Sequence, residues 1–378
     1  MHTPDIHCPV THEPTADRAA LGPLLAYLRS GARPDVDVTF PKGSLRADGR
    51  LDLCKQDTGV TGCRDVLAAL TESYAVSSLL LGTNGIGDEG AALLADATRS
   101  VRLKTLYLGC NLIGPEGTAR LADVLADDTH VRALWLKRNP IRPEGARALA
   151  GMLRRNRHLR TLDLVNTGIG PDGAAAVIDA LLEADHPLER LYLGGNGLDE
   201  TTAPLLADLV RHGRLRGLYL NVNHLGDGGA GVLADALRDA RDLDAIGLAS
   251  NGLTDAGVAR VLSAVAEGGT VTDVDLGFSP STRVLGASGN TLGQAGVLAA
   301  HHLLRAHLTL RSLELPTRHA GVSTAGVEAE ASRHPRLTRF THGRHVTPAV
   351  RTRLEENVMR HGPAAPHEDA RMIRSVYR

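Results

Sequence analysis

Metal-binding side chains gather near the start of the sequence, in the stretch HCPVTH, which contains His7, Cys8 and His12. Histidine and cysteine bind zinc or copper, but strong zinc sites have four ligands at a recognisable spacing. This segment offers three candidates, so a metal- or haem-associated role stays open only as an alternative. We expect that the chain holds no metal and needs no cofactor.

Motifs of catalysis are missing from the sequence, which has no GxSxG, no HExxH, no P-loop and no GxGxxG in a strand-turn-helix setting. Three histidines, His301, His302 and His307, lie in a stretch of helical periodicity and need no ligand to explain them. Asp163 would have a raised pKa if it were buried between aromatic rings, but no partner base or nucleophile accompanies it. We therefore expect that the chain is not an enzyme.

An internal repeat positions these residues. The stretch KTLYLGCNLIGPEGTARLADVL begins at Lys104, and RALWLKRNPIRPEGARALAGML begins at Arg132. The second leucine of each LxL-like pair recurs at a period of about 28 residues, at Leu53, Leu81, Leu108, Leu136, Leu164, Leu193, Leu220, Leu248, Leu276 and Leu315. Such a period, kept over most of the chain, marks a solenoid.

Each repeat predicts a short strand, a tight turn and a helix. In LKTLYLGCN the inward residues Leu103, Leu106 and Leu108 alternate with outward ones. Three residues after the leucine comes an asparagine in most repeats, whose amide can both donate and accept and so can satisfy buried turn backbone. Parallel strands spaced about 4.8 Å apart beside helices spaced about 8–10 Å apart make the stack curve.

The pattern LxxLxLxxN, followed by glycine and an alanine- and leucine-rich helix, resembles the ribonuclease-inhibitor-like class of leucine-rich-repeat proteins. The resemblance covers roughly residues 50–330. It implies an α/β fold, a right-handed leucine-rich-repeat horseshoe solenoid with a parallel β-sheet on the concave face and helices on the convex face. Members of the class include nuclease inhibitors, GTPase activators and sensor modules of immune receptors, and most act by binding proteins.

The ends of the array need caps because a solenoid exposes apolar faces there. We predict a helix over 16–31 and a strand in 36–40 at one end, and a degenerate strand over 337–340 followed by a helix that starts after Thr347 at the other. The expected organisation is a flexible tail (1–15), an N-terminal cap (16–49), ten repeats (50–330) with an insertion at 278–289, a C-terminal cap (331–362) and a tail (363–378).

The position between the two leucines faces out of the concave sheet and forms a row. Along the repeats it holds Asp52, Leu80, Tyr107, Trp135, Asp163, Tyr192, Tyr219, Gly247, Asp275 and Glu314. The one tryptophan and three of the six tyrosines of the chain fall on this row. Aromatic residues suit strands in general, but they also form the energetic centres of protein interfaces. Their small neighbours are expected to leave the ring faces open, and these side chains are expected to carry little core packing.

The row predicts a binding face. Its aromatic part includes Leu80, Tyr107, Trp135, Asp163, Tyr192 and Tyr219, and its acidic end includes Asp273, Asp275 and Glu314. The insertion is either a tolerated surface loop or a specificity loop in which Phe278 and Arg283 contact the partner. An aromatic floor with an acidic end suits a protein or peptide with a basic segment.

The composition limits the classes of partner that we expect the chain to bind. A net charge of −1 and a pI near 7.0 argue against nucleic acid and against anionic membranes. Four cysteines without CxxC spacing, no signal segment and no long apolar run favour the cytoplasm. Arginine far outnumbers lysine, which suggests a bacterial origin. The sequence predicts a protein-interaction scaffold, or alternatively a regulator of an enzyme that resembles a nuclease inhibitor or a GTPase activator.

Overall fold

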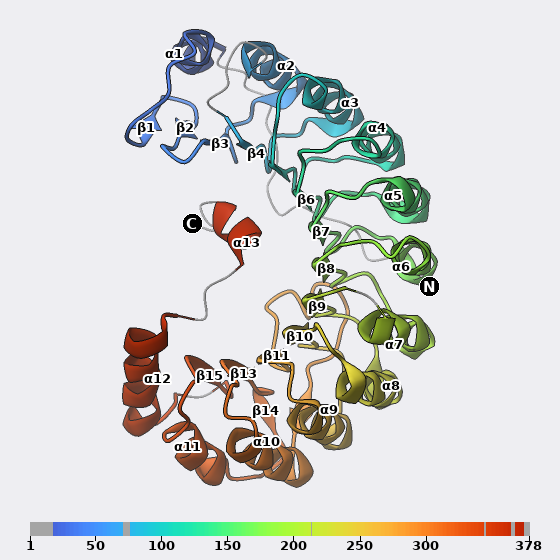
Figure 1. Ribbon diagram of the computed structural model, residues 1–378, viewed down its shortest axis with the longest axis vertical. Helices are drawn as coiled ribbons and strands as arrows, with labels where there is room; N and C mark the ends of the chain where they lie inside the picture. The colour runs from blue at the N-terminus through green and yellow to red at the C-terminus, as the bar shows by residue number, and fades with distance from the viewer. Residues whose placement is uncertain (1–17, 71–75, 213, 344, 364–366, 374–378) are drawn as a thin grey trace. The chain divides into compact units, whose positions relative to one another are not determined.

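The computed structural model describes residues 18–70, 76–212, 214–343, 345–363 and 367–373. The chain divides into two compact units. The N-terminal unit comprises residues 5–188 together with 366–378, and the C-terminal unit comprises residues 1–4 and 189–365. A segment from the end of the chain therefore belongs to the N-terminal unit (Figure 1).

The N-terminal unit contains a sheet with the order β1-β2-β3-β4-β5-β6-β7. Strands β1 to β3 pair antiparallel and β3 to β7 pair parallel. The strands are β1 (Val38–Thr39), β2 (Ser44–Leu45), β3 (Arg50–Asp52), β4 (Ser78–Leu80), β5 (Thr105–Tyr107), β6 (Ala133–Trp135) and β7 (Thr161–Asp163). The helices are α1 (Arg18–Arg29), α2 (Gly59–Leu70), α3 (Gly87–Thr98), α4 (Pro115–Leu125), α5 (Arg142–Arg155), α6 (Gly170–Glu183) and α13 (Glu368–Met372).

The C-terminal unit contains a parallel sheet with the order β8-β9-β10-β11-β13-β15 and a small parallel pair, β12 with β14. The strands are β8 (Arg190–Tyr192), β9 (Gly217–Tyr219), β10 (Ala245–Gly247), β11 (Asp273–Asp275), β12 (Thr291–Leu292), β13 (Ser312–Glu314), β14 (Arg318–His319) and β15 (Arg339–Thr341). The helices are η1 (Glu200–Thr202), α7 (Ala203–His212), α8 (Gly226–Asp239), α9 (Asp255–Gly268), α10 (Gln294–Ala306), α11 (Ala325–Ala331) and α12 (Pro348–His361).

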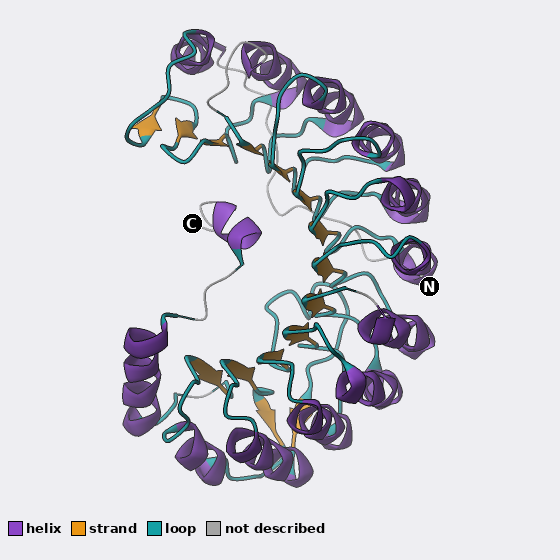
Figure 2. Cartoon of the chain, in the orientation of Figure 1, coloured by secondary structure: helices purple, strands orange, loops and turns teal. Residues whose placement is uncertain are grey.

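Within each unit the repeat helices cover one face of the sheet, as Figure 2 shows, and the core lies between the two layers. In one repeat Leu106 and Leu108 come from the strand side and Leu121 and Leu125 from the helix, and none of the four is more than 1% exposed. Each such leucine contributes about 1.5–3 kcal/mol to folding. The alternation of strands and helices confirms the predicted α/β solenoid. We call the uncovered sheet face of each unit its strand face.

The asparagines form the predicted ladder. Asn111 Nδ2 donates to the carbonyl oxygens of Leu81 and Leu108 at 2.9 and 3.0 Å, and its Oδ1 accepts from the backbone N–H of Asn84 at 2.9 Å. Buried backbone groups at the turns are thus satisfied by the neighbouring repeat. Where Thr167 replaces asparagine, its hydroxyl still donates to the carbonyl of Leu164 at 2.8 Å.

The caps agree with the elements that the sequence predicts. Helix α1 lies within 16–31, β1 lies within 36–40, and β15 extends the sheet from β13 as the degenerate strand. Helix α12 begins at Pro348, directly after Thr347. For residues 363–378 the sequence predicts a tail and no helix, whereas in the structure residues 368–372 form helix α13. The predicted tail 1–15 lies outside the described residues.

The insertion is fastened to the repeat before it. Asn290 takes the ladder position, because its Oδ1 accepts from Asn251 N–H at 3.0 Å and its Nδ2 donates to the Leu276 carbonyl at 3.0 Å. The Thr282 hydroxyl lies 2.7 Å from the Ser250 hydroxyl. The motif is therefore restored at Asn290, as the sequence predicts.

Candidate functional site

The row predicted from spacing exists on the strand face of each unit. In the N-terminal unit strand register aligns Asp52, Leu80, Tyr107, Trp135 and Asp163. In the C-terminal unit it aligns Tyr192, Tyr219, Gly247, Asp275 and Glu314. We call these sets the N-terminal row and the C-terminal row.

The N-terminal row is buried. Leu80 is 0% exposed, Tyr107 and Trp135 are 3% exposed, and Asp163 is 2% exposed. The expectation that small neighbours leave the rings open is wrong here. A Cβ placed on Gly82 would lie 2.4 Å from Cε1 of Tyr107, so the glycine lets the ring lie flat on the sheet.

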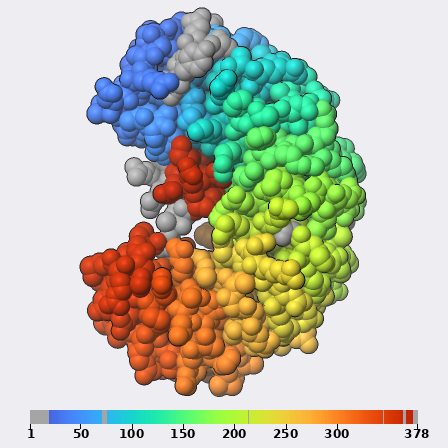
Figure 3. All heavy atoms as spheres, in the orientation of Figure 1, coloured from blue at the N-terminus to red at the C-terminus, as the bar shows by residue number. Residues whose placement is uncertain are grey.

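The end of the chain covers part of this row. His367 stacks on Trp135 with ring centroids 6.2 Å apart and an interplanar angle of 7°. The Thr161 hydroxyl donates to Oδ2 of Asp369 at 2.7 Å, and an Arg50 guanidinium nitrogen donates to the Met372 carbonyl at 3.4 Å. In Figure 3 the segment is the red patch lying against the rest of its unit. We call residues 367–373 the C-terminal segment.

Asp163 and Lys137 provide the charge at this site. Burial raises the pKa of Asp163 to about 6, against the opposing effects of the nearby Lys137 and of the Val165 N–H, which donates to it at 2.8 Å. Burial also lowers the pKa of Lys137, whose Nζ lies 5.7 Å from the centroid of the Tyr107 ring. The pKa of the buried Asp163 is thus raised, as the sequence leads one to expect for a desolvated carboxylate.

The C-terminal row is half-buried. Tyr192 and Tyr219 stack with centroids 4.2 Å apart and an interplanar angle of 6°. A Cβ placed on Gly217 would lie 2.9 Å from Cε2 of Tyr219, so glycine again makes room for the ring. Burial raises the pKa of Tyr219. The two rings thus cover one face of each other and form a compact aromatic pair that stays partly exposed.

The acidic end of the C-terminal row already has polar contacts. Asn221 Nδ2 donates to Asp275 Oδ2 at 3.0 Å, and Arg339 pairs with Glu314 at 2.7 Å. Burial raises the pKa of Asp273, Asp275 and Glu314. These carboxylates are half-buried and poorly hydrated, which favours a nearby cation.

The insertion exposes its larger side chains. Phe278 is 51% exposed and Val284 is 77% exposed, while Arg283 is also exposed. The backbone between them is held by the bonds to Ser250. Both residues of the predicted specificity loop, Phe278 and Arg283, are therefore accessible from solvent.

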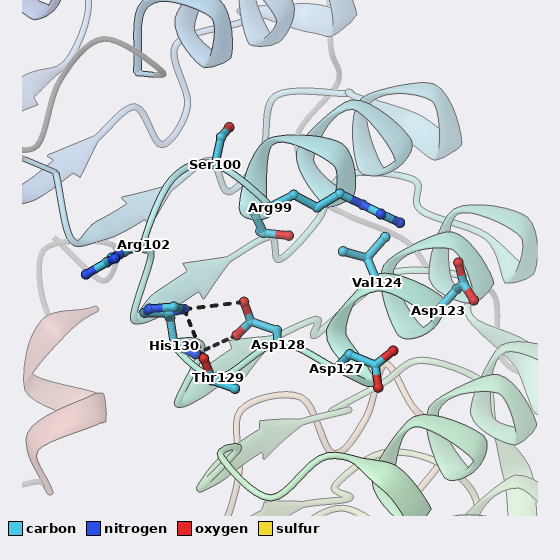
Figure 4. Close-up of a pocket in the computed structure, with 10 residues that line it drawn as sticks. Arg99, Ser100, Arg102, Asp123, Val124, Asp127, Asp128, Thr129 and His130 are labelled. Carbon is cyan, nitrogen blue, oxygen red and sulfur yellow. Dashed lines mark hydrogen bonds and ion pairs between the residues drawn. The ribbon is translucent and has the colours of Figure 1, made fainter.

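Polar groups of the described residues also gather around a pocket away from the rows. This pocket of about 490 Å³ is bounded by Arg99, Arg102, Asp127, Asp128 and His130, among others (Figure 4). His130 Nδ1 lies 3.9 Å from Asp128, whose carboxylate also accepts two backbone N–H groups. Asp127 pairs with Arg155 at 2.6 Å, so both carboxylates already have contacts within the chain.

Two of the histidines that the sequence analysis singled out, His301 and His307, make structural contacts. His301 lies 3.4 Å from Glu330, and His307 contributes its carbonyl to a 3.1 Å contact with a His334 ring nitrogen. Within the described part of the chain no group of three or more His, Cys, Asp and Glu side chains could hold a metal ion. The stretch with His7, Cys8 and His12 lies outside it.

Comparison with known proteins identifies the repeat. Residues 127–150 and 155–177 match the family model described as Leucine Rich repeat. The chain carries leucine-rich repeats. No curated protein matches the sequence closely enough to count as a relative.

Solved structures share the fold at low identity. The crystal structure of the Rad7 and Elc1 complex in yeast aligns with 90% of this chain and 81% of that chain, with 14% identity and a TM-score of 0.52. Leiomodin-1 Actin-Binding Site 2 covers 43% of this chain and 87% of that chain, with 14% identity and a TM-score of 0.36. The Caenorhabditis elegans tropomodulin C-terminal domain covers 39% and 90%, with 20% identity and a TM-score of 0.32. Because the TM-scores of the last two comparisons lie below 0.5, only the first bears on the fold.

Two functional statements follow. Leucine-rich-repeat proteins generally act as protein-interaction scaffolds. Among the helices in the described residues, none combines the length and the apolar character needed to cross a membrane.

Proposed function

We propose that this chain is a non-enzymatic scaffold that binds a protein or peptide on the strand faces of its units. The observation that carries the proposal is the seating of the C-terminal segment on Trp135. In this segment His367 stacks on the Trp135 ring, Asp369 accepts a hydrogen bond from the Thr161 hydroxyl, and the Met372 carbonyl accepts one from the Arg50 guanidinium. A face that holds one peptide segment by such contacts has the chemistry to hold another.

The partner-binding residues of the proposal are those of the two rows and the insertion. They are Leu80, Tyr107, Trp135, Asp163, Tyr192, Tyr219, Asp273, Asp275, Glu314, Phe278 and Arg283. The stacked pair of Tyr192 and Tyr219 is half-buried and leaves part of its aromatic surface exposed, and tyrosine is enriched among the residues that dominate protein interfaces. The desolvated carboxylates beside it support a partner with a basic segment.

The proposal also includes the class of leucine-rich repeat, the type of organism and the cellular compartment. A repeat of about 28 residues with one helix each supports the ribonuclease-inhibitor-like class. The arginine-rich composition supports a bacterial source. The spacing of the four cysteines, which contains no CxxC pair, supports the cytoplasm, and in the described residues Cys63 is a buried free thiol. Neutral net charge supports protein partners over nucleic acid or membranes.

The test is capture of a partner from native cytosol, followed by affinity measurements with two matched variants of the full chain. Tyr219→Ala removes a ring of the C-terminal row and should weaken binding by about 2 kcal/mol or more if it is a hot spot. Tyr27→Ala removes a half-buried tyrosine that packs on Phe40 at 5.4 Å and lies outside both rows. Equal affinities for the two variants would show that the partner does not use the row.

A further inference from the structure

The C-terminal segment is held on the strand face of the N-terminal unit by contacts of three kinds, one with Trp135 of the N-terminal row and two with residues of the same strand face. His367 provides a flat ring for Trp135, Asp369 provides a carboxylate for Thr161, and the Met372 carbonyl accepts from Arg50. Ile373, the residue after the helix, is 1% exposed. The apolar side chain of Ile373 is thus out of solvent directly after the helix that carries Asp369.

The side of the same helix that faces solvent carries different residues from the side that faces the sheet. Glu368 and Arg371 are exposed, while Asp369 and Met372 are half-buried. His367 accepts the N–H of Ala370 at 3.3 Å through Nδ1 and so caps the helix on which it sits. The segment therefore presents an ordered, one-sided surface to the row, with the imidazole fixed in place for stacking.

A helix of five residues does not hold together alone, since isolated helices shorter than about 12–15 residues are marginal in water. Its order depends on the surface beneath it. The chain holds it near that surface, which gives a weak contact the benefit of a high effective concentration. A segment bound in this way can be replaced by another ligand of the same chemistry.

We infer that the N-terminal row around Trp135 is a binding site for short acidic helical segments and that the C-terminal segment is its resident occupant. The site takes a flat ring over Trp135, a carboxylate at the Thr161 hydroxyl two residues later, and an apolar side chain four residues after the carboxylate. A partner of this row presents that pattern and must displace the C-terminal segment to bind. This last step rests on the proposed function, whereas the seating of the segment does not.

Trp135 is the one tryptophan in the sequence, so its fluorescence in the full chain reports this site alone. Asp369→Ala removes the acceptor for Thr161 and should lower the ratio of docked to undocked segment by about tenfold, because the bond is charge-assisted. Acrylamide should then quench Trp135 more strongly. Glu368→Ala removes the neighbouring, exposed carboxylate and should leave quenching as in the wild type.

A matched pair on the other side of the contact checks the row. Thr161→Ala should act like Asp369→Ala, while Thr105→Ala changes the same residue type at the corresponding position of β5, two strands away. Far-UV circular dichroism confirms that each variant is folded. The inference is overturned if quenching is unchanged by Asp369→Ala and Thr161→Ala, or if the control variants raise it as much.

Addition of a synthetic peptide tests the site as a receptor. A peptide of residues 363–378 should restore protection of Trp135 in the Asp369→Ala chain, and should act on the wild-type chain only at far higher concentration because the resident segment competes. The same peptide with the Asp369→Ala change should not protect. Failure of the wild-type peptide to protect would refute a separable binding site. That result would remove one support of the proposed scaffold function without deciding it, because the test of that function uses Tyr219 and a captured partner.

Discussion

The two rows occupy the same position of the same repeat, yet they have different surroundings. In the N-terminal row the aromatic side chains are almost fully buried, with a lysine, a carboxylate and the C-terminal segment around them. In the C-terminal row Tyr192 and Tyr219 stack on each other and stay half-buried. The repeat fixes which way a side chain points, and its neighbours fix whether it meets solvent.

Glycine plays the same part in both rows. Gly82 lies under the ring of Tyr107, and Gly217 and Gly247 flank the ring of Tyr219. The rings therefore lie along the sheet in each unit, and glycine does not account for the difference. What differs is the further cover, which in the N-terminal row includes the C-terminal segment.

The largest expected effect tests the burial of the N-terminal row. Trp135→Ala should lower the free energy of unfolding by roughly 3–5 kcal/mol, as expected for a buried tryptophan. Tyr219→Ala, from a half-buried position, should cost about 1–2 kcal/mol. Urea denaturation followed by circular dichroism measures both, with Tyr27→Ala as the half-buried control.

This prediction replaces the expectation that the row carries little core packing. Tyr27→Ala should resemble Tyr219→Ala, because both tyrosines are half-buried and each packs against one other aromatic ring, tilted at 58° for Tyr27 and stacked for Tyr219. If Trp135→Ala costs no more than these two, Trp135 is not packed as the structure has it.

The repeat could be read from the sequence because it is a local pattern repeated many times. The period of the leucines predicts where the strands lie. The spacing of the asparagines predicts the hydrogen-bonded ladder, and the structure confirms its bonds. The row followed from alternation along a strand, and register in each unit places its members side by side.

The contact of the C-terminal segment with the N-terminal row could not be predicted from the sequence pattern. The segment HEDARMI is too short for helical periodicity to stand out. Its contact joins Asp369 to Thr161, which are 208 residues apart. Spacing in sequence carries no information about so distant a pair, and the burial of Trp135 depends on it.

The second prediction compares Asp163 with Asp275, which take the same row position in the two units. Asp163 has a pKa of about 6 in the folded chain against an ordinary value of 3.8. Between about pH 4 and pH 6 the folded state thus binds more protons than the unfolded state, so stability falls as pH rises. The total fall from this group is roughly 2–3 kcal/mol.

Asp163→Asn should remove that fall, which thermal or urea unfolding at several pH values would show. Asp275→Asn is the matched change at a half-buried position, where burial also raises the pKa, and it should flatten the profile less. Lys137 loses an attraction in Asp163→Asn, so its own pKa should drop further. A pH profile unchanged by Asp163→Asn would mean that Asp163 is hydrated in solution.

The smallest expected effect concerns the acidic end of the C-terminal row. Arg339 pairs with Glu314 at 2.7 Å, but the arginine side chain is 64% exposed, so solvent screens the pair. Arg339→Ala should therefore change the free energy of unfolding by only about 0.5 kcal/mol. Its effect on the pKa of Glu314 is more telling, because Arg339 opposes the rise that burial and the neighbouring Asp275 cause. Without the arginine that pKa should rise further, which NMR titration of the glutamate side chain would detect.

The same variant tests binding at the acidic end. In Arg339→Ala the Glu314 carboxylate no longer pairs with an arginine of its own chain, so a captured partner with a basic segment should bind this variant more tightly at neutral pH, with a stronger dependence on salt. Arg311→Ala, also at an exposed arginine of this edge, is the control for loss of a positive charge alone. Equal gains in affinity from the two variants would mean that the partner responds to net charge and not to a freed carboxylate in the row.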